Sequence, residues 1–393
     1  MSTRIAKVTS ITARRAAERK RSEQSVANAR AATTLFAVVA ALLVIGVTAT
    51  ISASSAVAID QQSDSFYFFK RQLVGIGLGV VAMAVASRVP YTAYKKLAVP
   101  IFAVTVGLLL ATMAIGTGAN GAQRWIAIGP ITIQASEIAK FAVIVVLAAV
   151  LDKKRKLLGD FGHFSAPVVA VMGVTGLLIM LQPDLGTTIV IAAAALGVIL
   201  TSATPLRFVM YTGLAGTILA TVLAFSSNYR LDRIIGFRDP WADVEGTGWQ
   251  LIQSYYALGS GGMTGVGLGA SRARWFYLPN AHTDFIYAII GEETGFVGGL
   301  VVMLLFVLLA AAGWAIASRA VDPFGRMVAT GITVWLSFQA IVNIGGVLGV
   351  LPITGITLPF VSYGSTAVAV SMGAVGVLAN IASSGGSRPR RRS

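Results

Sequence analysis

Six ionisable side chains lie within or beside the long apolar stretches of this sequence: Glu137, Lys140, Asp184, Asp284, Glu292 and Glu293. A charge in such surroundings is costly, so each is a candidate for function. Asp284 follows His282 at the end of a polar loop and precedes an apolar run. A carboxylate there can act as a general base at the rim of a cavity, or it can cap a helix. The absence of cysteine and the presence of only two histidines exclude thiolate chemistry, disulfides and histidine-rich metal centres.

Each of the other groups also has a purely structural interpretation. Glu137 and Lys140 are three residues apart, so they share a helix face and would form an ion pair or line a cavity. Asp184 is a favoured N-cap for the apolar segment that follows it. Glu292 and Glu293 would form a solvated helix end, a structural contact or part of a cavity. The residues alone leave these alternatives open.

The apolar composition predicts the elements that must position these groups. Hydrophobic residues make up 55% of the 393 residues and charged residues only 12%, which is about half the charged share of a soluble domain. A bilayer core about 30 Å thick needs about 20 apolar residues per helix. The sequence therefore predicts an all-α integral membrane protein with about ten transmembrane helices, at 31–53, 68–87, 97–116, 134–151, 165–182, 186–203, 206–225, 285–318, 324–348 and 358–382.

The eighth predicted span is too long for one simple crossing of the bilayer. It extends from Thr283 to Ser318, and a continuous helix of that length would measure about 54 Å. We therefore expect its first residues to lie at the membrane interface or in the wall of a cavity.

The distribution of charge predicts the orientation. A net charge of +15 fits either a nucleic-acid-binding protein or a membrane protein with basic loops. With the N-terminus inside, 22 Lys and Arg residues lie on the inner side and 8 on the outer side, so the positive-inside rule places both termini in the cytoplasm. Because this charge is spread over loops and tails without a basic fold or stacking motif, no nucleic-acid partner is expected. Contact of the two tails with anionic lipids is expected instead.

The chain divides into three predicted regions. Residues 1–30 form a disordered basic cytoplasmic tail, residues 31–384 the ten-helix membrane domain, and residues 385–393 a second basic cytoplasmic tail. A large extracytoplasmic loop at 226–282 joins helices seven and eight. If the ionisable groups converge, they line a cavity in the membrane domain. Three roles would be consistent with such a protein: glycosyl or phosphoryl transfer on a lipid-linked substrate, ion-coupled transport, or a structural scaffold.

Several blocks, taken together, resemble the SEDS family (shape, elongation, division, sporulation) of membrane-embedded peptidoglycan polymerases over about residues 31–384. The blocks are Gly121–Ile126, Gln134–Lys140, Gln182–Thr187, Ala281–Ile286, Gly291–Glu293, Asn343 and Leu358–Gly364. In the outer loop, Asp239–Asp243, Gln253–Gly259 and Gly265–Gly269 are more similar to the division-type branch than to the elongation-type branch. The sequence departs from the family pattern at Ala135, Asn280, Thr294 and Ser365–Thr366, and none of these is an ionisable site residue.

The resemblance implies a peptidoglycan glycosyltransferase that polymerises lipid II on the outer face of the bacterial cytoplasmic membrane, at the division septum. It assigns Asp284 as the general base. As substrate-binding or cavity-supporting residues it implies Glu137, Lys140, Asp184, Ser362, Arg124, Trp125, His282, Thr283, Glu292 and Asn343. Lys140, Arg124 or a divalent cation, Mg²⁺ or Mn²⁺, would stabilise the leaving diphosphate, and no other cofactor is implied.

The family also implies partners, namely a class B penicillin-binding protein transpeptidase and other membrane proteins of the division machinery. A lipid II flippase, an elongation-type polymerase and a scaffold for division proteins are the alternatives.

Overall fold

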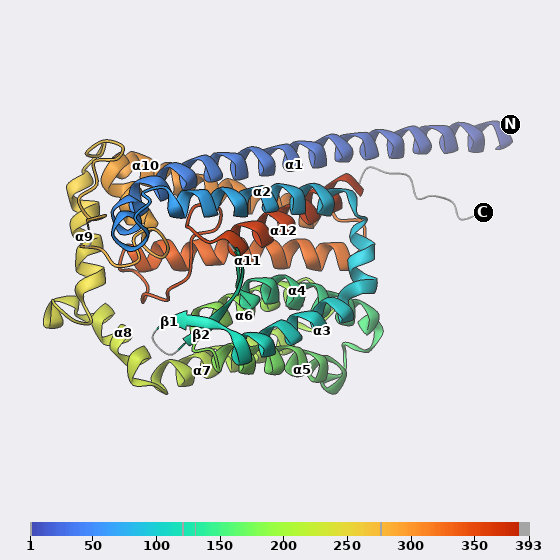
Figure 1. The fold of residues 1–393 in the computed structure, drawn as a ribbon. Helices are drawn as coiled ribbons and strands as arrows, with labels where there is room; N and C mark the ends of the chain where they lie inside the picture. Colours follow the sequence, from blue (N-terminus) through green and yellow to red (C-terminus); the bar gives the residue numbers. More distant parts are fainter. Residues whose placement is uncertain (1, 120–121, 130, 276, 385–393) are drawn as a thin grey trace.

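The computed structural model describes residues 2–119, 122–129, 131–275 and 277–384, and it is built almost entirely of helices (Figure 1). Long helices correspond in order to the predicted spans: α1 (Ser2–Gln62), α2 (Tyr67–Arg88), α3 (Tyr91–Ile115), α4 (Ala135–Lys153), α5 (Phe161–Met180), α6 (Leu185–Leu200), α7 (Leu206–Phe225), α10 (Ile286–Ser318), α11 (Pro323–Val347) and α12 (Ser365–Ser384). The predicted tail at 385–393 lies outside the described residues.

Eight of the helices in the described part of the chain are long and apolar enough to cross a membrane, which makes this a multi-pass membrane protein. The predicted spans outside this set are α4, which carries Glu137, Lys140 and Asp152, and α6, which has only 16 residues. Both are largely buried among other helices, since α4 packs against α3 and α6, and α6 packs against α11. Neighbouring helices rather than lipid therefore cover most of their surface.

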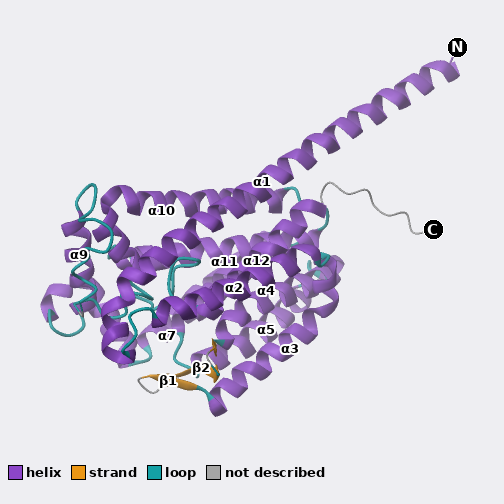
Figure 2. Cartoon of the chain, turned by 45° about the horizontal axis from the view of Figure 1, so that its top comes forward, coloured by secondary structure: helices purple, strands orange, loops and turns teal. Residues whose placement is uncertain are grey.

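α1 extends well beyond the other helices at the end of the bundle that carries both termini (Figures 1 and 2). We expected a disordered tail at residues 1–30, whereas residues 2–30 continue the helix of the first span. A helix of 61 residues is about 90 Å long, three times the thickness of the hydrocarbon core.

Besides the predicted helices, the structure contains a small antiparallel sheet that we did not predict. β1 (Thr117–Ala119), β2 (Ala122–Ile128) and β3 (Ile131–Ile133) lie between α3 and α4 in the order β1-β2-β3. Ile126 pairs with Ile133, and Ile128 pairs with Ile131. The seven residues of β2 do not alternate between apolar and polar, and β1 and β3 have only three residues each, so the sequence carries no clear strand signal between the two apolar spans.

The predicted outer loop is partly helical. It contains α8 (Asn228–Arg238), a 3₁₀ turn at Pro240–Asp243 and α9 (Trp249–Gly261). These elements lie at the end of the bundle opposite the two termini, the same end as the β1–β2 hairpin (Figure 1). With both termini in the cytoplasm, this end is the outer face.

A break in α10 explains why the eighth span is so long. Gly295 has φ 68° and ψ −167°, so the element is two helices joined at this glycine. The short first helix carries Glu292 and Glu293, and the second crosses the membrane. Gly295 lies against the backbone of the preceding loop, because a Cβ added to it would lie 2.4 Å from the nitrogen of Gly265.

Gly295→Val is expected to lower the free energy of unfolding by at least about 2 kcal/mol, because a β-branched residue is strained at positive φ and would also collide with the loop backbone. Unfolding of the detergent-solubilised protein measures this change. Gly107→Val on α3 is the matched control, since a Cβ there meets no atom within 4 Å. An equal loss of stability in the two variants would show that the break is not a required feature.

Candidate active site

The loop between α11 and α12 forms one wall of the candidate site. We predicted a span beginning at 358, but α12 begins at Ser365 and residues 358–364 fold as turns. Phe360 explains this difference, because its φ of 65° is left-handed and cannot be part of a right-handed helix. Non-helical backbone inside a membrane protein needs hydrogen-bond partners from the protein itself.

Side chains from several helices supply those partners. Gln339 Nε2 on α11 donates to the carbonyl of Thr357 at 2.9 Å. Gln72 Nε2 on α2 donates to the carbonyl of Ser362 at 3.2 Å, and Gln72 Oε1 accepts from Gly364 N at 3.1 Å. Ser362 Oγ accepts from the nitrogen of Leu358 at 2.8 Å, which closes the turn. The loop is therefore held in one conformation by buried amides.

Asp284 lies in the turn just before α10, partly buried beside this loop. Asn343 Nδ2 donates to the carbonyl of Asp284 at 2.8 Å and to that of Ile356 at 2.7 Å, and thus joins the two segments. Ser362 Oγ donates to the carbonyl of Thr283 at 2.6 Å. These bonds fix the backbone around Asp284 and leave its carboxylate at a small cavity that Ile353 also lines.

Two arginines and a second carboxylate set the electrostatics of Asp284. Burial raises the pKa of Asp284 to about 6, the nearby charges of Arg233 and Arg124 lower it, and Asp184 raises it. Gly355 lies between Asp284 and Arg233, since a Cβ on it would lie 3.5 Å from Asp284 Oδ2 and 3.4 Å from Arg233 Nη1. A carboxylate with a pKa near 6 is suited to accept a proton close to neutral pH.

Arg124 and Asp184 lie together at the rim of this site. Arg124 Nε on β2 donates to the carbonyl of Gln182 at 3.0 Å, and Nη2 donates to that of Pro183. Asp184 caps α6, because it accepts from the nitrogen of Thr187 at 3.0 Å and from the Thr187 hydroxyl at 2.8 Å. The structural interpretation of Asp184 therefore fits the geometry, and the cap also places a carboxylate near Asp284.

Glu137 and Lys140 form a buried ion pair below the site. Lys140 Nζ donates to Glu137 Oε1 and to Gln339 Oε1, both at 2.8 Å, and the lysine side chain is fully buried. Trp335 Nε1 donates to the same Gln339 oxygen at 2.8 Å. Since Gln339 in turn holds the carbonyl of Thr357, this network supports the loop, and its positive charge is neutralised within the bundle.

His282 and Trp125 lie next to the site without reaching the carboxylate of Asp284 in any described contact. The imidazole of His282 packs between Phe68 and Tyr363, with ring centroids 4.6 Å and 5.7 Å away. Burial lowers the pKa of His282 to about 4, so the ring is neutral at pH 7. Trp125 pairs with Thr117 within the small sheet.

The structure does not bring Glu292 to Asp284, although both were predicted for one site. Glu292 accepts from the nitrogens of Arg272 at 3.0 Å and Ala273 at 3.3 Å. Glu293 accepts from the hydroxyl of Ser52 on α1. Glu292 therefore anchors the end of the outer loop to the region of the break in α10, and Glu293 ties α1 to the same region.

Two departures from the family pattern acquire a structural explanation. Asn280 has φ 56°, a left-handed conformation that Asn adopts more readily than most residues. Its carbonyl accepts from the nitrogen of Asp284 at 3.1 Å. Ser365 Oγ donates to the carbonyl of Arg71 at 3.0 Å and Thr366 Oγ1 donates to that of Thr132 at 2.7 Å, so these hydroxyls tie α12 to α2 and β3.

Gln339 and Arg233 are the main site residues that sequence reasoning missed. Gln339 precedes Asn343 by four residues, so the two amides share a face of an apolar helix, and this spacing could have revealed it. Arg233 is one of several arginines in the outer loop, and its type and spacing do not distinguish it from the others.

The fold and the site define a multi-pass membrane protein that holds a partly buried carboxylate and two arginines at the outer end of its helical bundle. The family model described as cell cycle protein, FtsW/RodA/SpoVE, matches residues 32–386, so the chain belongs to this family, which is the SEDS family predicted from the sequence.

Individual relatives agree with this assignment. The chain is 41% identical over 342 residues to stage V sporulation protein E of Bacillus subtilis (strain 168), covering 86% of this chain and 93% of the relative. It is 40% identical over 338 residues to the probable peptidoglycan glycosyltransferase FtsW of Geobacter sp. (strain M18), covering 86% and 92%.

Solved structures show the same fold. A chain of a peptidoglycan synthase complex, studied for how it coordinates polymerization and crosslinking, superposes with a TM-score of 0.73 at 27% identity, covering 89% of this chain and 97% of that one. The rod shape determining protein RodA of Thermus thermophilus superposes with a TM-score of 0.61 at 25% identity, covering 88% and 94%.

Proposed function

We propose that this chain is a peptidoglycan glycosyltransferase of the FtsW type, which polymerises lipid II at the outer face of the cytoplasmic membrane during cell division. The observation that carries the proposal is the partly buried Asp284, fixed through its backbone by Asn343 and placed within the field of Arg124 and Arg233. Relatives named FtsW and peptidoglycan glycosyltransferase support the activity.

In the proposed reaction, Asp284 accepts the proton from the 4-hydroxyl of the acceptor GlcNAc. The freed oxygen attacks the anomeric carbon of the growing chain, and undecaprenyl diphosphate leaves. An α-linked donor then gives a β-1,4 bond by inversion, which needs one positioned base and no covalent intermediate.

The leaving diphosphate is stabilised by positive charge at the rim of the site. Arg124 and Arg233 suit this role because both lie near Asp284 at the outer end of the bundle. Lys140 is less suitable, because its ammonium group is buried and bonded to Glu137 and Gln339.

A divalent cation, Mg²⁺ or Mn²⁺, would supply further positive charge for the diphosphate. In the part of the chain that the structure describes, no three His, Asp or Glu side chains gather as a metal site. Mg²⁺ is commonly bound by one or two carboxylates together with substrate phosphates. Asp184 is the carboxylate that would fit this arrangement, because it lies near Asp284 and leaves Asp284 free to act as the base.

The proposed partners are a class B penicillin-binding protein and other division proteins, with the septum as the site of action. The similarity to a chain from a peptidoglycan synthase complex that polymerises and crosslinks supports a crosslinking partner. Polymerisation of lipid II by the purified chain, with and without such a transpeptidase, tests the proposed function. Glycan strands in neither reaction would contradict it.

The rate of polymerisation is expected to rise with pH through about 6 and to level off above about 7, because Asp284 with a pKa of about 6 acts only when deprotonated. His282, with a pKa of about 4, adds no second transition between about pH 5 and pH 8. Initial rates across this range measure the profile, and lipid II binding at each pH is the control. Equal rates at both ends of the range, with binding unchanged, would contradict the role of Asp284.

A further inference from the structure

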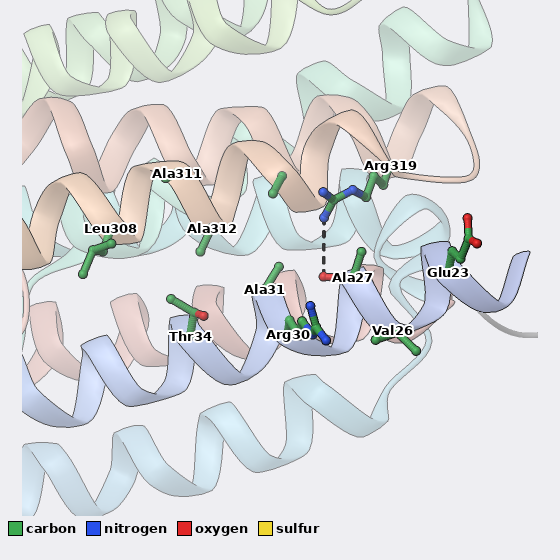
Figure 3. Close-up of a pocket in the computed structure, with 11 residues that line it drawn as sticks. Glu23, Val26, Ala27, Arg30, Ala31, Thr34, Leu308, Ala311, Ala312 and Arg319 are labelled. Atoms are coloured by element: carbon green, nitrogen blue, oxygen red, sulfur yellow. Dashed lines mark hydrogen bonds between the residues drawn. The ribbon is translucent and has the colours of Figure 1, made fainter. Parts of the chain in front are cut away.

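A second cavity, of about 660 Å³, lies far from Asp284, between α1 and α10 (Figure 3). Its α1 wall extends from Glu23 to Thr34, and its α10 wall extends from Leu308 to Arg319 just past the helix end. This volume is within the range of ligand-binding pockets. We call it the α1–α10 groove.

The length of the groove along the helix axes matches the thickness of one leaflet of the bilayer. In each wall the first and last lining residues are eleven positions apart in the sequence. At the rise of an α-helix this is about 16 Å along the axis, or about half of the 30 Å hydrocarbon core. Arg319 directly follows the end of α10 at the cytoplasmic side of the bundle. The groove therefore begins at the cytoplasmic surface and ends near the middle of the membrane.

Charge is concentrated at the cytoplasmic end of the groove. Arg30 is exposed on α1, and Arg319 extends from the end of α10 so that its Nη1 donates to the carbonyl of Ala27 at 3.4 Å (Figure 3). Glu23 lies at the same rim and opposes part of this charge. Among the titratable groups that line the groove, two cations therefore face one carboxylate.

The deeper part of the groove is apolar and lined mostly by small side chains. Ala31 and Ala312 form its floor, where α1 and α10 pack closely, and Ala311 and Leu308 line its open side. Thr34 supplies the one hydroxyl among the lining side chains. An apolar chain can lie along such a surface, whereas a charged group cannot be solvated there.

We propose that the α1–α10 groove binds one anionic phospholipid of the cytoplasmic leaflet, with its phosphate at Arg30 and Arg319 and an acyl chain along Ala311 and Leu308. Arginine binds phosphate oxygens in a bidentate manner, and basic pockets between transmembrane helices on the cytoplasmic side suit lipid head groups. A partner's transmembrane helix fits less well, because it would need a groove that crosses both leaflets. The site is independent of the polymerase activity proposed for Asp284.

Native mass spectrometry of the full chain, titrated with phosphatidylglycerol or phosphatidylcholine of equal chain length, tests this proposal. The wild type is expected to retain phosphatidylglycerol about tenfold more tightly. Arg30→Gln combined with Arg319→Gln is expected to abolish this preference, while Glu23→Gln preserves or increases it. Arg207→Gln, which removes an arginine at the cytoplasmic end of α7, is the matched control and is expected to have no effect.

A second variant tests the apolar part of the groove without altering charge. Ala311 is exposed, so Ala311→Trp fills the groove without displacing the α1–α10 packing, and it is expected to reduce retention of both lipids. A preference for phosphatidylglycerol that survives the double arginine variant would overturn the proposal. Unchanged retention in Ala311→Trp, or crosslinking of the groove to a partner's helix in place of lipid, would also overturn it.

Discussion

Asp284→Asn is expected to lower the rate of lipid II polymerisation by roughly 10²–10⁴-fold, the contribution typical of a general base. Asn has nearly the same shape as Asp but cannot accept the proton of the acceptor hydroxyl. The bonds that Asn343 and Ser362 make to this turn go to backbone carbonyls, so the loop should keep its conformation. Single-turnover polymerisation of bound lipid II measures the effect.

Asp232→Asn is the matched control for this experiment, because it removes an exposed carboxylate on α8, also on the outer face. Its rate is expected to stay within about twofold of wild type, since exposed substitutions away from a site have small effects. A well-folded Asp284→Asn protein that polymerises at the wild-type rate would refute the assignment of the base.

Lys140→Met is expected to lower the free energy of unfolding by about 3–5 kcal/mol, because it leaves Glu137 buried without its partner. The same change removes a donor to Gln339 and so weakens the support of the loop beside Asp284. Glu137→Gln combined with Lys140→Met should recover part of the loss, since the uncompensated charge is gone. Unfolding of the detergent-solubilised variants measures both effects.

Lys95→Met provides the comparison for an exposed ion pair. Lys95 contacts Asp152 at the end of α4, and 43% of its side chain is exposed, so its loss is expected to change stability by at most about 1 kcal/mol. If Lys140→Met is no more damaging than Lys95→Met, the buried pair does not have the proposed structural role.

The helices could be predicted from the sequence because their length and apolarity reflect the thickness of the bilayer. The same criterion failed at residues 358–364, which are apolar enough for a span but turn at Pro359 and lie in the wall of the site. Hydropathy also showed that the eighth predicted span was too long for a single crossing of the bilayer. It could not place the break at Gly295, because the break depends on contact with the loop around Gly265.

The candidate site could be predicted in part. Asp284 was predicted from its position between a polar loop and an apolar run, and Asn343 and Ser362 from the family resemblance. The structure places the three together through the bonds of Asn343 and Ser362 to the turn that carries Asp284. Glu292 has the same chemistry but is held by the outer loop, and Arg233 approaches Asp284 from that loop. Which polar groups converge is a property of tertiary packing, and one sequence does not specify it.

The most direct test of the role of Asp284 uses the purified chain in liposomes that contain lipid II. Glycan polymer and the movement of lipid II across the bilayer are measured in the same vesicles, for the wild type and Asp284→Asn. We predict polymer with the wild type, almost none with the variant, and equal lipid II movement in both. Lipid II movement without polymer in the wild type would contradict the proposed function and would indicate a transporter.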